Sequence, residues 1–541
     1  MDRLKVEMFT VDREHLSVVS VVKTVAFYWC FLVRIILDCV TDVLFGLYYS
    51  AFHPRVFLPA PRSTLLLESA TFLSRKIRAR EIRSADVVEE FITRIKDVNP
   101  IINAVVADRF EEARREARQV DRLLESGSLS DEFSVDKKPF LGVPFTCKEC
   151  MRVVGLPNTS GLYLRKGFVA KEDADCVRLM RAAGGIALAV SNVSEICMWW
   201  ESSNKIYGQT RNPYDTRRTV GGSSGGEAAL LASCGSPMGI GSDIGGSIRM
   251  PAFFNGIFGH KPTFGLVSNA GQFPDASGAL SKFLVTGPMC RFSEDLIPMY
   301  KVLLASKADR LLLDQPVDLS KLKLYFAVDD GGFPLISPVQ TSIKKALMDA
   351  VHHLESRCGA EMVSFEPIKP LRFSLDVWSS MMSMDDHTFT EDMANREGKV
   401  NPYTELAKWF LGLSPHTFPA VALGLTEEVT AKFPERQEHF VQMCAELEET
   451  FVKMLGPDGV FIYPTHPRTA PFHHQPLLMP FNFAYTAIFN VLGLPSTHIP
   501  LGLDSNNLPL GVQVVSNHYN DRFSLAVAKE LERAFGGWLC P

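Results

Sequence analysis

A long uncharged apolar run is missing from the sequence. Residues 16–52 are mostly apolar and aromatic, but four charged residues interrupt them: Lys23, Arg34, Asp38 and Asp42. The longest uncharged part is shorter than the roughly 20 residues that a membrane-spanning helix needs. No small-residue cleavage site of a signal peptide follows it. Three interpretations stay open: a single-pass anchor whose charges snorkel, an interfacial helix, and a buried helix of a soluble protein.

An excess of charge, internal repeats and low-complexity tracts are also missing. The formal net charge is −5 and no basic block dominates, which argues against nucleic acid as a partner. The 11 cysteines are odd in number and scattered, so they do not indicate a disulfide framework. We therefore expect an intracellular, reducing environment for the catalytic part of the chain.

What is present is the composition of a large α/β protein. Of the 541 residues, 46% are hydrophobic and 22% are charged, which is ample material for a core. Short apolar runs such as 140–147 and 186–190 alternate with helical patterns, and this predicts an α/β fold with a parallel or mixed sheet. We expect an N-terminal membrane-associating segment (1–52), a proline-rich linker (53–63) and one catalytic domain (64–541).

Two serine-bearing glycine clusters lie about one helix apart. Residues 221–226 read Gly-Gly-Ser-Ser-Gly-Gly, and residues 241–247 read Gly-Ser-Asp-Ile-Gly-Gly-Ser. Amide hydrolysis needs an activated nucleophile, donors for the oxyanion and an acid for the leaving nitrogen. Ser247 is a candidate nucleophile, and glycines allow backbone amides to approach a substrate closely. The candidate oxyanion donors are the amides of Ile244, Gly245, Gly246 and Ser247.

Two further residues complete a proton pathway in this interpretation. The Ser223 hydroxyl can accept and donate at once, so it can pass a proton between a base and Ser247. Lys148, at the end of a strand-like run, can be that base if its amine is neutral, which requires desolvation or nearby positive charge. Plainer interpretations stay open: the 245–247 cluster as a structural turn, and the lysine as a surface charge or an ion-pair partner.

These positions and their surroundings resemble the amidase signature family. The similarity extends from about residue 65 to residue 538 and covers seven ordered blocks: 139–149, 158–161, 221–249, 259–263, 287–291, 493–495 and 509–513. Two further blocks, 198–208 and 250–256, are most similar to the vertebrate-type fatty-acid amide hydrolases of that family, particularly their second form. So many blocks in one order are far more specific than any single short motif.

The resemblance implies a fold and a Ser-Ser-Lys triad. The fold is a large mixed β-sheet flanked by helices on both faces. Ser247 is the implied acylated nucleophile, Ser223 the proton shuttle that follows a cis peptide bond, and Lys148 the base. Asp243 and Arg249, which flank the turn, are expected to hold the loop and not to take part in the chemistry.

The resemblance also implies an activity and partners. It implies a membrane-associated serine amidase that hydrolyses fatty-acid amides, such as N-acylethanolamines and primary fatty amides, to a fatty acid and an amine. The partners implied are a lipid amide substrate and a membrane surface, and a homodimer is compatible with the sequence. An amidase or esterase of short or non-lipid substrates is the alternative, and a membrane-tethered scaffold without catalytic activity is a third reading.

Two apolar segments bear on the substrate. Met198, Trp199 and Trp200 precede the shuttle serine and are candidates to line an acyl channel, with ordinary core packing as the alternative. Residues 406–425 are strongly apolar, and their two prolines predict two short helices instead of a span. These helices form either a buried hairpin of the core or an exposed patch that enters one membrane leaflet.

Three other motifs do not support a different chemistry. Ser224 matches a G-x-S-x-G pattern, but the polar stretch 215–219 before it does not read as the strand that a nucleophile elbow requires. Cys147 and Cys150 form C-x-x-C without the second pair of a zinc site. His473 and His474 are adjacent in sequence and therefore project apart. We expect no metal and no organic cofactor.

Overall fold

An eleven-stranded sheet runs through the centre of the protein. The computed structural model describes residues 18–126, 131–275, 278–384, 387–430 and 432–541. The strand order is β1-β3-β2-β6-β8-β7-β12-β13-β11-β9-β10. The strands are β1 (Val105–Asp108), β2 (Pro144–Lys148), β3 (Ile186–Ser191), β6 (Met238–Asp243), β7 (Phe258–Lys261), β8 (Val285–Cys290), β9 (Lys323–Phe326), β10 (Glu361–Met362), β11 (Gly459–Pro464), β12 (Ser496–Leu503) and β13 (Pro509–Ser516). A two-stranded sheet, β4 (Ser203–Asn204) and β5 (Gly208–Gln209), lies apart from it.

The sheet is mixed, as the resemblance implies. β2 runs parallel to β3 and β6, and β9 runs parallel to β10 and β11, while the remaining pairs are antiparallel. Every residue of β2, β3, β6, β8 and β13 is buried, so these strands are covered on both faces. The sequence of β3, Ile-Ala-Leu-Ala-Val-Ser, is accordingly an apolar run up to its last residue and not an alternating pattern.

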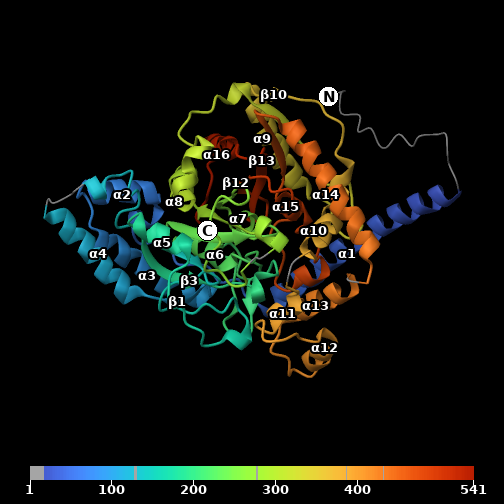
Figure 1. Ribbon diagram of the computed structural model, residues 1–541, viewed down its shortest axis with the longest axis horizontal. Helices are drawn as coiled ribbons and strands as arrows, with labels where there is room; N and C mark the ends of the chain where they lie inside the picture. The colour runs from blue at the N-terminus through green and yellow to red at the C-terminus, as the bar shows by residue number, and fades with distance from the viewer. Residues whose placement is uncertain (1–17, 127–130, 276–277, 385–386, 431) are drawn as a thin grey trace.

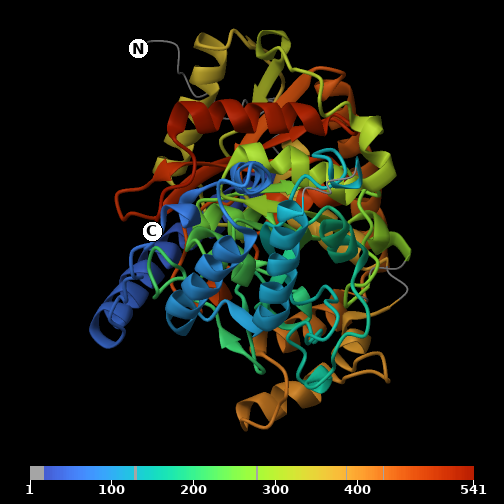
Figure 2. The ribbon, with the colours of Figure 1, turned by 90° about the vertical axis from the view of Figure 1, so that its left-hand side faces the viewer.

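Helices surround the sheet. Figures 1 and 2 show α2, α3 and α4 together at one end of the molecule, next to β1. The helices are α1 (Val18–Phe52), α2 (Ala70–Arg78), α3 (Ser84–Ile102), α4 (Phe110–Glu125), α5 (Asp175–Ala182), α6 (Gly225–Ala232), α7 (Arg249–Asn255), α8 (Leu296–Leu304), α9 (Thr341–Ser356), α10 (Ser374–Met382), α11 (Phe389–Met393), α12 (Pro402–Phe410), α13 (Phe418–Thr430), α14 (Pro434–Leu455), α15 (Ala484–Val491) and α16 (Asp521–Phe535).

Three of the four charges that interrupt the N-terminal apolar segment, Arg34, Asp38 and Asp42, contact the rest of the protein. In α1, Arg34 forms an ion pair with Asp38, and both side chains are buried. Asp42 pairs with Arg468 and accepts a hydrogen bond from Gln475 Nε2 at 2.6 Å. Because these charges are used in docking, the outward side of α1 is apolar, with exposed residues Trp29, Leu32, Val33, Ile36, Leu37, Val40, Val43, Leu44, Leu47, Tyr48 and Phe52.

This arrangement corrects one of the three interpretations of the segment. With Trp29 65% and Phe52 71% exposed, α1 is not a buried helix of a soluble core. In the described part of the chain, no helix combines the length and the apolar character needed to cross a membrane. The segment 53–63 that follows contains neither helix nor strand.

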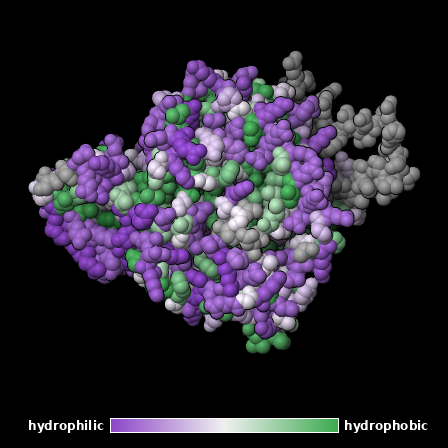
Figure 3. Space-filling model, in the orientation of Figure 1, coloured by the Kyte–Doolittle hydropathy of each residue, from purple (hydrophilic) through white to green (hydrophobic). Residues whose placement is uncertain are grey.

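Residues 406–425 fall in two short helices, as predicted. α12 and α13 pack against each other, and α13 buries Ala420, Val421 and Gly424. The end of α12 and the turn after it are different: Phe410, Leu411 and Leu413 are 73%, 72% and 70% exposed. Figure 3 shows hydrophobic surface at the lower tip of the molecule, where Figure 1 places α12. The buried-hairpin interpretation is therefore wrong for this tip and right only for the inner face of α13.

Candidate active site

The candidate catalytic residues meet at the carboxyl ends of parallel strands. Lys148 ends β2, which lies between β3 and β6, and the second glycine cluster begins at the end of β6. Ligand sites of α/β sheets commonly occupy this edge. Lys148, Ser223 and Ser247 line one cavity, which offers about 1040 Å³ of space including its opening to solvent.

Lys148 is neither a surface charge nor an ion-pair partner. Its side chain is buried, and no ion pair with a carboxylate is found for it among the described residues. Its Nζ lies 2.6 Å from Ser223 Oγ, 3.0 Å from Ser242 Oγ and 3.5 Å from the Ser242 carbonyl oxygen. All its partners are uncharged oxygens, and this corrects both plainer interpretations of the lysine.

Ser223 is held close to the lysine by an unusual turn. The Gly222–Ser223 peptide bond is cis, and α6 begins two residues later. A Cβ at Gly222 would lie 2.4 Å from the Trp199 carbonyl oxygen, so only glycine fits at this position. The first turn of α6 is fixed by Ser202 Oγ, which accepts from the Gly225 N–H at 3.0 Å.

Ser247 lies in the turn between β6 and α7, and a buried ion pair supports this turn. Asp243 and Arg249 are fully buried and 3.1 Å apart. Asp243 also accepts hydrogen bonds from the backbone N–H groups of Gly246 and Ile248. Burial alone would raise the pKa of the Asp243 carboxyl, but the Arg249 guanidinium more than offsets this and holds it below its usual range. The prediction that Asp243 and Arg249 hold the loop is confirmed.

Three of the four predicted oxyanion donors remain available. The Gly246 N–H donates to Asp243 Oδ1 at 2.6 Å, so the structure turns this amide away from the cavity. Ile244 and Ser247 line the main cavity, and Gly245 lines a smaller one beside it. Within the described residues, no acceptor is found for the N–H groups of Ile244, Gly245 and Ser247. Gly246 instead shapes the turn: its φ is +119° and a Cβ there would lie 2.0 Å from Thr486 Oγ1.

Buried carboxyls hold the elements beneath the site. Glu227, in the first turn of α6, accepts hydrogen bonds from Thr146 Oγ1 of β2 and from Ser191 Oγ of β3, the latter at 2.6 Å. Burial raises the pKa of the Glu227 carboxyl to about 7. Glu149 is likewise buried, accepts from the N–H groups of Thr159 and Ser160, and has its pKa raised to about 7 by burial. Glu149 therefore points away from Lys148, as the strand alternation predicts.

The predicted substrate residues divide between the two cavities. Met198 lines both, while Trp199 and Trp200 line only the smaller one. Trp200 is also a core residue, because it is 2% exposed and its Nε1 donates to the Pro480 carbonyl at 3.0 Å. The smaller cavity also contains Ser247, so it extends the space around the candidate nucleophile.

Several residues that line the cavity are not evident as site residues from the sequence. Trp378 of α10 lines both cavities and donates from Nε1 to the Ile244 carbonyl at 3.0 Å. Cys197 lies beside the candidate triad; burial alone would raise the pKa of its thiol, but a hydrogen bond from Cys150 and the charge of Lys148 lower it. Leu423 and Thr426 come from α13. Of these residues only Leu423 had a sequence signal, because it lies in the apolar run at 406–425.

The alternative motifs have structural roles. Ser224 caps α6 and its Oγ donates to the Ser242 carbonyl at 3.3 Å, and residues 210–223 directly before it form no strand. Cys147 and Cys150 are free thiols, as are all the other cysteines. His473 pairs with Glu201 at 2.9 Å, and the neighbouring His474 side chain does not join that pair. The disulfide framework and the nucleophile elbow are thus both excluded.

Comparisons with known proteins agree with this geometry. The protein-family model described as Amidase matches residues 86–525. The chain belongs to the amidase signature family. It is 50% identical to human fatty-acid amide hydrolase 2 over 484 residues, which cover 88% of this chain and 91% of the human protein. It is 48% identical to fatty-acid amide hydrolase 2-A of Danio rerio over 490 residues, covering 90% and 92%. A solved fatty acid amide hydrolase shares the fold, with a TM-score of 0.69, 22% identity, and coverage of 89% of this chain and 87% of that one. The protein is therefore an enzyme, an amidase.

Proposed function

We propose that this amidase hydrolyses fatty-acid amides at a membrane surface through Ser247, Ser223 and Lys148. One observation carries the proposal: Lys148 Nζ lies 2.6 Å from Ser223 Oγ in the wall of a cavity that also contains Ser247. The relatives named fatty-acid amide hydrolase 2, at 48–50% identity over most of the chain, support the choice of substrate class.

Acylation follows from the partners of the lysine. A neutral amine has two N–H donors and one lone pair; the two oxygens of Ser242 accept from the donors, and the lone pair is left for the Ser223 hydroxyl. Ser223 passes its proton to Lys148 and takes the proton of Ser247, whose Oγ then attacks the amide carbon. The negative charge that forms on the carbonyl oxygen is stabilised by the free N–H groups of Ile244, Gly245 and Ser247.

The same pathway returns the proton. Lys148 now carries the proton, which passes through Ser223 to the amide nitrogen as the C–N bond breaks, so the amine leaves in neutral form. A water molecule then attacks the acyl ester on Ser247, with its proton taken up along the same route. This step releases the fatty acid and restores the serine hydroxyl.

The shape of the cavity supports a long acyl chain. From the triad, the cavity lining continues through Trp378 and Met382 of α10 to Phe389 of α11 and Leu423 of α13. α13 packs against α12, whose exposed apolar tip is directed outward. The cavity therefore extends from the candidate nucleophile to α13, the helix that packs on α12, and its lining there also includes the polar residues Asp392 and Glu427.

We propose that α1 lies in the membrane interface and does not cross the bilayer. Its charges Arg34, Asp38 and Asp42 are bound to the protein, and its other side is a continuous apolar stripe. This is the pattern of a helix that rests on a membrane with its apolar side in the acyl region. The free cysteines suit a reducing, intracellular location.

The experiment that tests the activity uses a series of primary amides and ethanolamides of increasing acyl length. Detergent-solubilised wild type should hydrolyse long-chain amides with higher kcat/KM than short ones, and Ser247→Ala should be inactive on all of them. Ser224→Ala is the matched control and should keep most of the activity, because Ser224 caps α6 and does not line the cavity. Activity confined to short amides or esters would favour the alternative substrate class.

The non-catalytic scaffold is tested in the same samples. A fluorophosphonate probe labels only an activated serine. Labelling of wild type and of Ser224→Ala, but not of Ser247→Ala, is the expected result. No labelling of any of the three would support a scaffold.

A further inference from the structure

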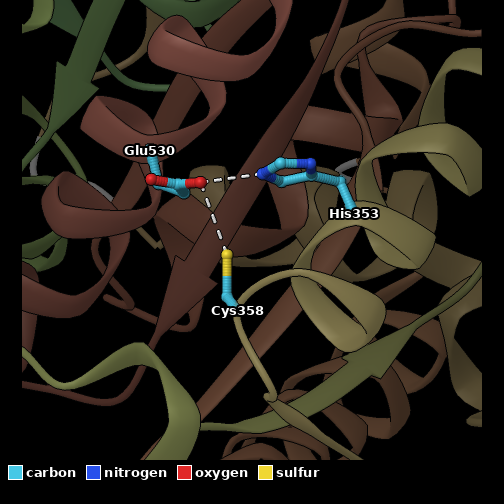
Figure 4. A group of neighbouring side chains, drawn as sticks. All are labelled: His353, Cys358 and Glu530. Carbon is cyan, nitrogen blue, oxygen red and sulfur yellow. Dashed lines mark hydrogen bonds and ion pairs between the residues drawn. The ribbon is translucent and has the colours of Figure 1, made fainter.

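Three side chains with different ligand atoms meet between α9 and α16, outside the active site. His353 lies in the last turn of α9, Cys358 follows α9 on the way to β10, and Glu530 belongs to α16 (Figure 4). Glu530 Oε1 lies 2.8 Å from His353 Nε2 and 3.4 Å from Cys358 Sγ. In the part of the chain that the structure describes, no other three His, Cys, Asp or Glu side chains bring their ligand atoms within 4.8 Å of one another.

We propose that His353, Cys358 and Glu530 form a zinc-binding site. An imidazole nitrogen, a thiolate and a carboxylate oxygen suit Zn²⁺, whereas Ca²⁺ and Mg²⁺ prefer oxygen ligands alone. Tetrahedral zinc places a sulfur and an oxygen ligand about 3.6 Å apart, and a nitrogen and an oxygen ligand about 3.4 Å apart. The sulfur–oxygen distance of 3.4 Å is already close to this value. The 2.8 Å nitrogen–oxygen distance must open by about half an ångström, which small side-chain rotations achieve.

The site is accessible and leaves room for a fourth ligand. The side chains of His353 and Glu530 are 18% and 13% exposed, so an ion can enter from solvent and keep one water molecule. Arg533 is the competing partner, since its Nη2 donates to Glu530 Oε1 at 2.6 Å and its Nε donates to Oε2 at 2.9 Å. The Arg533 side chain is 72% exposed, so losing the Nη2 contact costs little. The Nε contact can remain and orient the carboxylate for the metal.

Zinc binding here needs no oxidant or other reactant. The S–H bond of Cys358 is replaced by a sulfur–zinc bond, and its proton passes to solvent. His353 binds through Nε2 and keeps its proton on Nδ1, and Glu530 binds as a carboxylate. The oxidation state of every atom is unchanged.

The ion would connect two helices that pack on the same strand. Both α9 and α16 contact β13, and the zinc would join the end of α9 to α16. Its effect is therefore on stability and not on the amidase chemistry. Cys358 and Glu530 are 172 residues apart in the chain, which is why the short-spacing motifs of the sequence gave no indication of this group.

Cobalt and zinc titrations of the full-length, chelator-treated protein test the proposal. Co²⁺ bound to a thiolate gives a charge-transfer absorption in the near ultraviolet, and Zn²⁺ should displace it. We expect this band to saturate at one equivalent in wild type. The matched controls are His352→Gln and Cys39→Ser, which remove an exposed neighbouring histidine and an exposed cysteine and should leave the band unchanged.

Variants of the ligands decide the outcome. Cys358→Ser should abolish the band, and His353→Gln and Glu530→Gln should weaken cobalt binding by roughly tenfold or more. Zn²⁺ at a hundredfold excess over its Kd should raise the Tm of wild type by about 2 °C and that of Cys358→Ser not at all. His353→Gln keeps the thiol and serves as the decisive variant if Cys358→Ser does not fold. A band that persists in Cys358→Ser, or the absence of a stoichiometric band in wild type, would overturn the proposal.

Discussion

The apolar tip after α12 gives a quantitative prediction about membrane binding. Replacing Phe410, Leu411 and Leu413 together by serine should weaken the binding of the protein to phosphatidylcholine vesicles. Full burial of one such side chain is worth about 2 kcal/mol. The three residues are 73%, 72% and 70% exposed, so inserting their exposed parts into lipid contributes at most about 4 kcal/mol in total. This corresponds to a decrease of up to roughly a thousandfold in the partition coefficient.

Vesicle flotation measures this decrease, and a matched variant controls for the loss of exposed apolar surface elsewhere. Val135, Leu312 and Leu335 are 62%, 48% and 50% exposed and do not belong to α12, α13 or α1, so serine at these three positions should leave vesicle binding unchanged. The tip variant should also show a raised KM for a long-chain amide carried in vesicles, with unchanged kinetics on a soluble short amide. Equal binding of the tip variant and wild type, or equal losses in both variants, would contradict membrane contact through this tip.

Three further predictions concern the site and its support. Lys148→Ala should reduce kcat/KM for an amide about tenfold more than for the ester of the same acid, because an amine leaving group depends on the proton that Lys148 returns. Equal losses of kcat/KM on the amide and the ester would contradict this role of Lys148. Gly246→Ala should lower kcat roughly a hundredfold, because the new Cβ would lie 2.0 Å from Thr486 Oγ1 and displace the turn that carries Ser247. Gly245→Ala should lower kcat less, because its Cβ would lie 3.4 Å from the nearest side chain. A larger loss of kcat in Gly245→Ala than in Gly246→Ala would contradict this prediction. Burial raises the pKa of the Glu227 carboxyl from 4.5 to about 7. Between these two pH values the folded wild type keeps a proton that the unfolded chain releases. The free energy of unfolding therefore falls as the pH rises from 4.5 to 7, by up to about 3 kcal/mol. Glu227→Gln cannot titrate, so denaturant unfolding should show it gaining stability relative to wild type between pH 5 and pH 7.5, and a constant difference would count against the buried proton.

Much of the active site was predictable because its parts are local in sequence. The turns at Ser223 and Ser247 contain glycines of their own motifs and Lys148 ends its own strand, whereas the cis bond before Ser223 was implied only by the family resemblance. Parallel strands bring such ends together at one edge of the sheet, so motif and topology agree. The direction of one amide was not predictable: the Gly246 N–H faces Asp243, and this depends on the ion pair that Asp243 forms with Arg249.

Elsewhere, long-range partners decided the structure. The charges of α1 look unfavourable for membrane contact in the sequence, but they bind Arg468 and Gln475 more than 400 residues away and leave an apolar outer side. The residue pattern of 406–425 predicts two helices but not which side is covered, because that depends on α10, α11 and the cavity. The His353–Cys358–Glu530 group likewise arises only when α9 and α16 pack on the sheet.

Ser247 and the substrate class are tested most directly by hydrolysis of oleamide, oleoyl ethanolamide and matched short-chain amides by wild type and Ser247→Ala. We expect kcat/KM to rise with chain length in wild type and to disappear in the variant for every substrate. Long-chain amide hydrolysis that survives in Ser247→Ala would contradict the assignment of Ser247 as the nucleophile.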